Sequence, residues 1–234
     1  MKVASLINAC LSVLILIFLT GCASITGGQI SGVNWALDKN GGRITTFAEE
    51  PDHPATTLNN GITSSEMWDQ GEGWAASIMK SSGGRRSYNA QRDEHERYWI
   101  IVELAQPVTV SNVKLYTVDS EQYPADEYGV SDLLIQYEME NALKEKLWAN
   151  IDKLGKGIGD QDNVIRDNIT GVIDVRFRPV KTQRIRILIY GTNDLTRTED
   201  NSGAQQGMIR LTEIEVYGTG KHEGRDELEM LFNE

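Results

Sequence analysis

Cysteine is nearly absent from this 234-residue sequence and occurs only at Cys10 and Cys22. Residues 23–234 contain no thiol, which excludes a disulfide framework, a cysteine-ligated zinc site and a cysteine nucleophile from that part of the chain. An ordinary hydrophobic core must therefore hold the fold together. If residues 1–21 are removed, 213 of the 234 residues remain, which is enough for one domain of sandwich or barrel size.

Catalytic signatures are also missing. The three histidines are His53, His95 and His222, and His95 lies in the charged run 93–97 without the His-Glu-x-x-His spacing of a zinc helix. The sequence has neither a Gly-x-Ser-x-Gly elbow nor a Gly-x-x-x-x-Gly-Lys phosphate loop. No combination of nucleophile and base stands out, so we expect a protein that is not an enzyme.

Basic residues are scarce relative to acidic ones. Lysine and arginine total 23 and aspartate and glutamate 34, so the net charge is −11, or −12 once residues 1–21 and their single lysine are removed. A strongly acidic body argues against nucleic acid and anionic lipid headgroups as partners. It is compatible with neutral sugars and with cations.

The longest apolar stretch is at the amino terminus. Lys2 precedes the run from Leu6 to Leu19, which only a few small or polar residues interrupt, and Leu19-Thr20-Gly21-Cys22 follows. This ending resembles a bacterial lipobox, which implies cleavage before Cys22 and acylation of its side chain. An uncleaved membrane anchor is the alternative, because the run approaches a spanning length, but the Thr-Gly-Cys ending favours lipidation. Ala23 after the cysteine favours the outer membrane, if the host has one.

Four parts follow from this organisation. We predict a signal peptide over 1–21, a lipidated tether over 22–32, a folded domain over 33–218 and a flexible acidic tail over 219–234. The predicted location is the bacterial cell envelope, with the exported protein attached to a membrane through lipid on Cys22.

Period-two alternation dominates residues 33–218 and predicts strands. The clearest examples are 98–104, 133–138, 184–189 and 211–217, in which apolar residues alternate with polar ones. Strands this frequent, without long helices between them, predict an all-β antiparallel sandwich. Residues 138–153 have helical propensity, but we favour a hairpin whose second arm contains Leu147 and Trp148.

The segment from Asn59 to Trp68 is a polar turn. Asn60 and Ser65 carry side-chain oxygens, and the carbonyls between them could wrap a hard cation such as calcium. On composition alone, a hydrogen-bonded loop without metal is the better explanation of the segment.

The order of the sequence motifs resembles a discoidin domain, also called a coagulation factor V/VIII type C domain, of the galactose-binding-like superfamily. Bacterial examples are often classed as carbohydrate-binding module family 32. The resemblance covers about residues 33–218. The motifs that carry it are Asn34–Leu37, Leu58–Gly61, Trp68, Gly73–Trp74, Tyr98–Leu104, Val113–Tyr116, Tyr128–Tyr137, Leu147–Trp148, Phe177–Ile187 and Leu211–Gly218.

This resemblance implies a jelly-roll sandwich with neighbouring termini and, in many members, a structural calcium ion. Carried over by position, the calcium ligands are the carbonyls of Thr57, Ile62 and Thr212 and the side chains of Asn60, Ser65 and Glu213. The family usually has aspartate where this chain has Asn60, which removes one formal charge from the site. A solvated Glu213 beside Glu215 is the alternative.

The resemblance also implies ligand binding at loops on one end of the sandwich, where aromatic rings stack on sugars and polar groups bind their hydroxyls. We expect Trp74 and Tyr123 to be the stacking residues, with Arg85 and Asn193 as polar contacts. Trp74 could instead belong to the core, Tyr123 could pack over the sandwich end, and Arg85 could lie in a solvated loop. The segment 119–127 lacks the arginine and histidine typical of galactose-binding members, which argues against galactose itself.

The sequence therefore predicts a non-catalytic binding module on a membrane-anchored lipoprotein, with a glycan or polysaccharide as the ligand. The alternative is an adaptor or structural envelope lipoprotein that binds a protein partner and has no affinity for sugars.

Overall fold

The structure is a computed structural model that describes residues 32–80, 98–155, 163–197 and 205–219. The predicted signal peptide, Cys22, Arg85 and the tail from residue 220 lie outside these ranges. Among the described residues, no helix has the length and hydropathy that crossing a bilayer requires.

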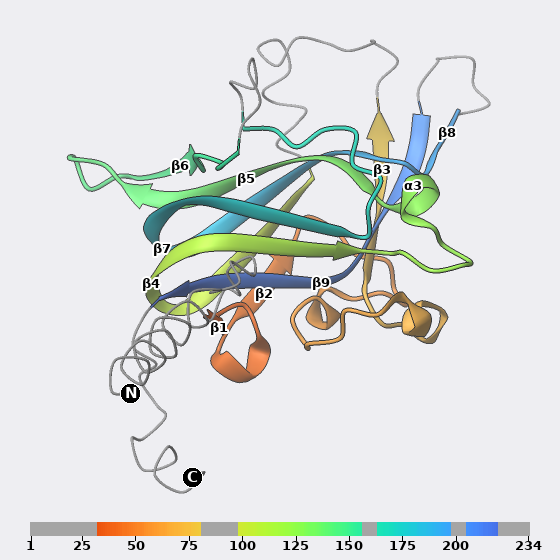
Figure 1. Cartoon of the computed structure of the whole chain (residues 1–234), viewed down its shortest axis with the longest axis horizontal. Helices are drawn as coiled ribbons and strands as arrows, with labels where there is room; N and C mark the ends of the chain where they lie inside the picture. Colours follow the sequence, from red (N-terminus) through yellow and green to blue (C-terminus); the bar gives the residue numbers. More distant parts are fainter. Residues whose placement is uncertain (1–31, 81–97, 156–162, 198–204, 220–234) are drawn as a thin grey trace, which may run out of the picture. The chain divides into compact units, whose positions relative to one another are not determined.

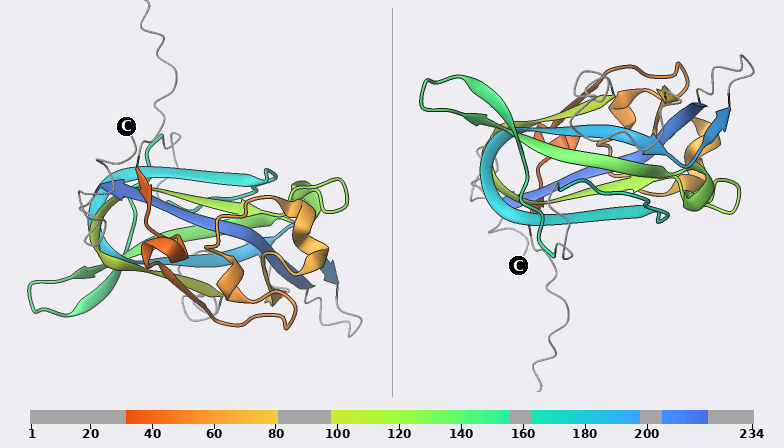
Figure 2. Two further views of the ribbon diagram at one scale, coloured as in Figure 1. Left: turned by 90° about the horizontal axis from the view of Figure 1, so that it is seen from below. Right: turned by 90° about the horizontal axis from the view of Figure 1, so that it is seen from above.

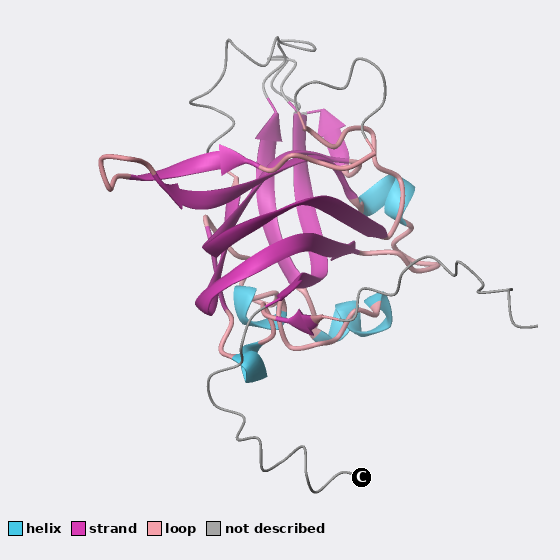
Figure 3. Cartoon of the chain, turned by 60° about the vertical axis from the view of Figure 1, so that its left-hand side comes forward, coloured by secondary structure: helices cyan, strands magenta, loops and turns pink. Residues whose placement is uncertain are grey.

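Strands make up most of the described chain (Figures 1 and 3), and every strand pair is antiparallel. The predicted all-β antiparallel sandwich is therefore confirmed. The strands are β1 (Val33–Asn34), β2 (Arg43–Thr46), β3 (Trp74–Lys80), β4 (Trp99–Thr117), β5 (Val130–Glu140), β6 (Lys146–Asn150), β7 (Val172–Thr192), β8 (Leu195–Arg197) and β9 (Gln205–Thr219).

Short helices occupy the connections around the strands (Figure 3). They are the 3-10 helices η1 (Asp38–Asn40), η2 (Ala55–Thr57) and η3 (Ser65–Gln70) and the single-turn helix α3 (Ala125–Tyr128). Ser64 precedes η3 and its hydroxyl accepts the backbone N–H of Glu66, as expected of an N-terminal cap.

Two long strands, β4 and β7, form the centre of the fold. The first part of β4 pairs with β7 from Trp99↔Leu188 to Glu103↔Arg184, and the last part pairs from Asn112↔Arg176 to Tyr116↔Val172, with register shifts between them. Figure 2 shows β7 curling from one layer of the sandwich into the other. One continuous two-stranded ribbon therefore contributes to both layers.

The core lies on the inner face of this ribbon and follows the predicted alternation. In β4, β5 and β7 alternate apolar residues are buried in this core, whereas Leu134 and Leu188, which lie between them, are buried in a separate small cluster. Burying these side chains supplies the main stabilisation, at roughly 25 cal/mol per Å² of apolar surface. The core residues contributed by these strands include Ile100, Val102, Leu104, Val113, Leu115, Leu133, Ile135, Ile173, Val175, Phe177, Ile185, Ile187 and Ile189.

The predicted hairpin at residues 138–153 is confirmed, because β5 pairs with β6 from Gln136↔Asn150 to Glu140↔Lys146. It projects beyond the rest of the sandwich (Figure 2). The hairpin is attached through Trp148, whose ring centroid lies 4.7 Å from the guanidinium carbon of Arg186 and 5.6 Å from that of Arg184. Tertiary contacts of this kind outweigh the helical propensity of the segment.

Strand β9 contains an irregularity that matters for the site. Tyr116 of β4 pairs with Glu213 and Thr117 pairs with Leu211, so Thr212 has no partner in this register. An extra residue of this kind is a β-bulge, which re-aims the side chains around it. Leu211, Thr212, Glu213 and Ile214 are consequently all buried.

The ends of the domain meet. Val33 and Asn34 of β1 pair with Gly218 and Tyr217 of β9, and the indole N–H of Trp35 donates to the Gly218 carbonyl at 3.3 Å. The neighbouring termini implied by the resemblance are present within the described domain.

Candidate functional site

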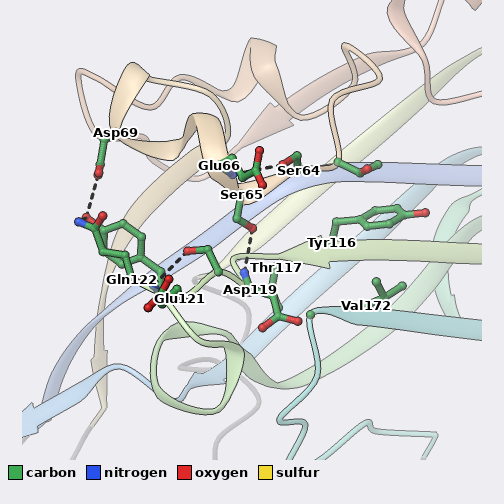
Figure 4. Close-up of a pocket in the computed structure, with 14 residues that line it drawn as sticks. Ser64, Ser65, Glu66, Asp69, Tyr116, Thr117, Asp119, Glu121, Gln122 and Val172 are labelled. Atoms are coloured by element: carbon green, nitrogen blue, oxygen red, sulfur yellow. Dashed lines mark hydrogen bonds between the residues drawn. The ribbon is translucent and has the colours of Figure 1, made fainter.

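A polar hollow lies where η3, the loop after β4 and the start of β7 come together (Figure 4). Its volume is about 850 Å³, within the range of roughly 300–1,000 Å³ typical of small-molecule sites. It is lined by Thr63, Ser64, Ser65, Glu66, Asp69, Tyr116, Thr117, Asp119, Ser120, Glu121, Gln122, Tyr123, Gly171 and Val172.

Hydrogen bonds fix the walls of the hollow. The backbone N–H of Asp119 donates to the buried Ser65 hydroxyl at 2.8 Å and joins the loop after β4 to η3. Within that loop, the Tyr123 N–H donates to the Ser120 hydroxyl at 3.1 Å. The Thr117 N–H donates to the Gly171 carbonyl at 3.0 Å and joins the end of β4 to the start of β7. Backbone N–H groups and serine hydroxyls within the lining therefore fix the walls of the hollow relative to one another.

Tyr123 lines the hollow, as predicted, but it also belongs to an aromatic cluster. Its hydroxyl donates to Asp69 Oδ1 at 2.8 Å, and this hydrogen bond is the main reason that the pKa of Tyr123 is raised. Its ring meets Trp68 and Tyr128 edge-on at centroid distances of 6.5 and 5.4 Å. Replacing Tyr123 with alanine would consequently remove packing as well as a ligand contact, contrary to the expectation for a ring at a loop tip.

Tyr116 is a second tyrosine in the lining, which the sequence did not identify. It lies in β4 opposite Val172 of β7, and its hydroxyl donates to Glu215 Oε2 at 2.8 Å. Burial, followed by this hydrogen bond, raises the pKa of Tyr116. The sequence signal that could have identified Tyr116 is the alternation of residues in β4, which places Tyr116 on the opposite face of the strand from the buried Leu115.

Negative charge dominates the lining. Glu66, Asp69, Asp119 and Glu121 contribute four carboxyl groups, and none of the lining residues is lysine, arginine or histidine. Arg210 lies close by, with its guanidinium carbon 5.8 Å from the Tyr123 ring centroid, but it is paired with Asp194 at 2.5 Å. The electrostatics of the hollow disfavour an anionic ligand.

The prediction that Trp74 is a stacking residue is wrong. Trp74 is 0 % exposed, and its indole N–H donates to the Ala48 carbonyl at 3.0 Å. Phe47 meets its ring edge-on at 6.0 Å. A ring enclosed in this way has no face to offer a ligand, so the alternative assignment of Trp74 to the core is confirmed.

Asn193 does not line the hollow. Its side-chain amide donates to the carbonyls of Ala125 at 2.8 Å and Asn168 at 3.0 Å, and its backbone N–H donates to the Gly129 carbonyl at 2.8 Å. Asn193 thus joins three segments next to the hollow and its amide hydrogens are committed to them. Arg85, the other predicted polar contact, lies outside the described residues.

The loop that carries most of the predicted calcium ligands lies against the β9 bulge. The Ile214 N–H donates to the Leu58 carbonyl at 2.7 Å, and the Thr212 hydroxyl donates to the Thr63 carbonyl at 3.0 Å. These bonds bring the 57–65 loop against Thr212 and Glu213. The alternative of a solvated Glu213 is wrong, because its side chain is fully buried.

Glu213 is the residue that most favours a cation. Its Oε2 accepts the Gly61 N–H at 3.1 Å, whereas its buried Oε1 has no hydrogen-bond partner in the described part of the chain. Burial raises the pKa of Glu213 to about 8. An unpaired buried carboxylate oxygen is destabilising, and a bound cation would satisfy it. The residues around Glu213 thus fit a hard metal ion.

The other two side chains in the predicted set already have partners. Asn60 Oδ1 accepts the Ile62 N–H at 2.8 Å and its amide donates to Glu72 at 2.9 Å, while the Ser65 hydroxyl accepts the Asp119 N–H. Each of these oxygens retains a lone pair for a metal. The described residues hold no group of three or more His, Cys, Asp or Glu side chains placed for a metal. The predicted set differs from such a group, because it has a single carboxylate and otherwise consists of carbonyl, amide and hydroxyl oxygens.

Comparison with known proteins finds likeness only in structure. No protein-family model matches the chain, and no curated protein matches it in sequence. The structure is similar to a module described as GH31 CBM32-2 bound to GalNAc, with 12 % identity and a TM-score of 0.49 over 76 % of this chain and 97 % of that one.

Two further neighbours are also family 32 modules. The module of EndoD from Streptococcus pneumoniae is 15 % identical, with a TM-score of 0.45 over 75 % of this chain and 96 % of that one. The module of NanJ from C. perfringens, solved with galactose, is 16 % identical, with a TM-score of 0.43 over 75 % and 93 %. These are similarities of architecture, and the assignment of this chain to the antiparallel β-sandwiches rests on its own strand pairing.

The buried Glu213 predicts a pH dependence of stability in buffer that contains a chelator. Its folded pKa of about 8 exceeds the ordinary value of 4.5, so the folded state binds more protons between these values. The contribution of Glu213 to the free energy of unfolding is then fully present below about pH 4.5 and is lost as the pH rises through 8. Urea unfolding at pH 6 and pH 9 should show a larger loss for the wild type than for Glu213→Gln. Equal losses in the two proteins would contradict the assignment.

Proposed function

We propose that this chain is a non-catalytic glycan-binding module carried by an exported lipoprotein. The observation that carries the proposal is the polar hollow lined by Tyr116 and Tyr123. Aromatic rings provide an apolar surface for the carbon face of a sugar, while carboxylates and hydroxyls accept hydrogen bonds from its hydroxyl groups. The lining of the hollow supplies both kinds of group.

The charge of the hollow selects among glycans. Glu66 and Glu121 are exposed in the lining and form no ion pair within the described part of the chain, and the net charge of the whole sequence is −11. Neutral glycans and glycans with free amino groups are therefore the favoured ligands, and uronic-acid or sulfated polymers are disfavoured by repulsion.

Binding without catalysis is also part of the proposal. Two of the lining carboxylates take part in local hydrogen bonds, Asp69 with the Tyr123 hydroxyl at 2.8 Å and Asp119 with the Ala125 N–H at 3.4 Å. These bonds shape the walls of the hollow, so the carboxylates of Asp69 and Asp119 position neighbouring groups. A shallow site with few contacts implies millimolar to high-micromolar affinity, about −4 to −6 kcal/mol.

Polysaccharide retention in affinity electrophoresis tests the function. Tyr123→Ala should weaken retention about tenfold, equivalent to about 1.4 kcal/mol, because the ring and its link to Asp69 are lost together. Tyr128→Ala is the matched control, since Tyr128 packs in the same cluster as Tyr123 but does not line the hollow. Circular dichroism melts of both variants separate unfolding from loss of binding.

If wild-type protein is retained by neither neutral nor amine-bearing polysaccharides, the glycan proposal fails. The protein-binding adaptor is then the better explanation.

We also propose that the module holds a structural calcium ion at Glu213. Thr57, Asn60, Ile62, Ser65 and Thr212 would supply the remaining oxygens. Calcium neutralises buried carboxylate charge, and here it would fasten the 57–65 loop to β9. The proposal is supported by the unpaired Oε1 of Glu213.

Thermal unfolding tests the metal. At a hundredfold excess of calcium over its Kd, binding should add about 2.7 kcal/mol to the free energy of unfolding. A chelator should therefore lower the Tm of the wild type, and Glu213→Ala should no longer respond to either reagent. Glu215→Ala is the matched control and should keep the calcium response. A wild-type melt that is insensitive to chelator and to millimolar calcium would refute the site.

The proposed location is the bacterial cell envelope, with acyl chains on Cys22 holding the module at a membrane. Support comes from the Leu19-Thr20-Gly21-Cys22 sequence after the apolar run. Each acyl CH₂ adds about 0.8 kcal/mol of membrane affinity. Cys22→Ser should abolish metabolic labelling with palmitate and leave a precursor that retains residues 1–21. Labelling that persists in this variant would disprove the anchor.

A further inference from the structure

The two tyrosines of the hollow come from different parts of the fold. Tyr123 lies in the loop after β4, and its hydroxyl contacts Asp69 at 2.8 Å and the Gln122 amide at 3.1 Å. Tyr116 lies within β4 beside Val172 of β7. Figure 4 shows Asp69 and Gln122 on one side of the hollow and Tyr116 with Val172 on the other. The hollow therefore has an aromatic contact at each end.

The end formed by Tyr116 is the more apolar. Val172 is 46 % exposed, although it is a large aliphatic residue, and it is the only aliphatic residue of this size among the described residues that line the hollow. An exposed aliphatic side chain next to a tyrosine ring forms a small apolar surface within an otherwise polar cavity. Such a surface suits the carbon face of a pyranose.

Tyr116 is held in place from the outside of the hollow. Its hydroxyl donates to Glu215 of β9 at 2.8 Å, and Glu215 itself does not line the hollow. The hydroxyl is thereby directed away from a ligand, while the ring remains part of the lining. A ring fixed before binding loses little conformational entropy when a ligand stacks on it.

Polar groups occupy the space between the two aromatic ends. Ser64, Glu66 and Asp119 lie there in Figure 4, and all three contribute to the lining. Hydroxyl and carboxylate oxygens in this position can accept hydrogen bonds from the sugar hydroxyls on either side of a glycosidic linkage.

We infer that the hollow binds at least two consecutive sugar residues of a glycan chain, one against Tyr123 and the next against Tyr116 and Val172. This inference rests on the proposed glycan function and narrows the ligand to an oligosaccharide segment. The volume of about 850 Å³, in the upper half of the usual range for ligand sites, provides the space for more than one pyranose ring.

The test is calorimetric titration of the full chain with sugars of increasing length. The probes are β-1,4-linked oligomers of glucosamine, N-acetylglucosamine and galactose, each from one to six residues. Wild-type affinity for the series that binds should rise about tenfold from the monosaccharide to the disaccharide. Tyr116→Ala should abolish this gain, so that its affinities for the monosaccharide and the disaccharide agree within twofold.

Two variants separate the ring from its surroundings. Tyr116→Phe keeps the ring and loses only the bond to Glu215, so it should retain most of the gain with length. Tyr217→Ala is the matched control, because Tyr217 also bonds Glu215 but does not line the hollow. The affinity of this variant should rise with oligosaccharide length as the affinity of the wild type does. Melting curves establish that each variant is folded at the titration temperature.

The outcomes are distinct. Equal wild-type affinity for all lengths, or a gain with length that survives in Tyr116→Ala, would overturn the inference and leave the glycan-binding function standing. If Tyr116→Ala does not fold, loss of the gain in Tyr116→Phe would equally overturn stacking on the ring. Absence of binding to every probe by the wild type would overturn both the inference and the proposed function.

Discussion

The antiparallel pairing of β4 with β7 is the interaction on which the rest of this structure depends. The two strands curl together from one layer of the sandwich into the other, and one face of this ribbon supplies much of the core. The same ribbon ends at the hollow. Thr117 closes β4 with a hydrogen bond to Gly171, directly before Val172 begins β7. The fold and the candidate site are thus set by a single register, and a slip of one residue would move Tyr116 from the outer face into the core.

The β9 bulge adds a second constraint. Without Thr212 as an extra residue, regular alternation would continue through this part of β9. The bulge lets four consecutive residues be buried, and Glu213 is among them. Burial of a carboxyl group is unfavourable, as the raised pKa of Glu213 shows, yet its contact with Gly61 draws the 57–65 loop onto the strand. The loop leads into η3, whose residues form one wall of the hollow.

Much of the fold was predictable from the sequence. Alternation of apolar and polar residues identified the strands that contain Ile100 and Ile187, because a face packed against a core leaves a period of two. The hairpin with Trp148 was also predicted, although propensity alone favoured a helix there. The bulge at Thr212 was not predictable, because one inserted residue leaves no local signal in the sequence of a strand.

The candidate site was only partly predictable. Tyr123 was identified because it is an aromatic residue in a predicted loop, at a position where the family that the sequence resembles binds ligands. Trp74 was assigned wrongly, because a tryptophan in the core and one at a surface look alike in sequence, and only packing against Phe47 and Ala48 decides between them. Tyr116 was missed because its neighbours in the hollow, Val172 and Glu66, are distant in sequence and meet only through the strand pairing.

The two ends of the domain lie at the opposite end of the sandwich from the hollow. Val110 of β4 pairs with Gly218 beside β1, whereas Thr117 of the same strand lies at the hollow. Val110 and Thr117 are seven residues apart along β4, which corresponds to about 23 Å at 3.3 Å per residue. Anything attached before Val33 or after Thr219 therefore leaves the sandwich at the end far from the hollow. Attachment of the domain through either of its ends would therefore leave the hollow unobstructed.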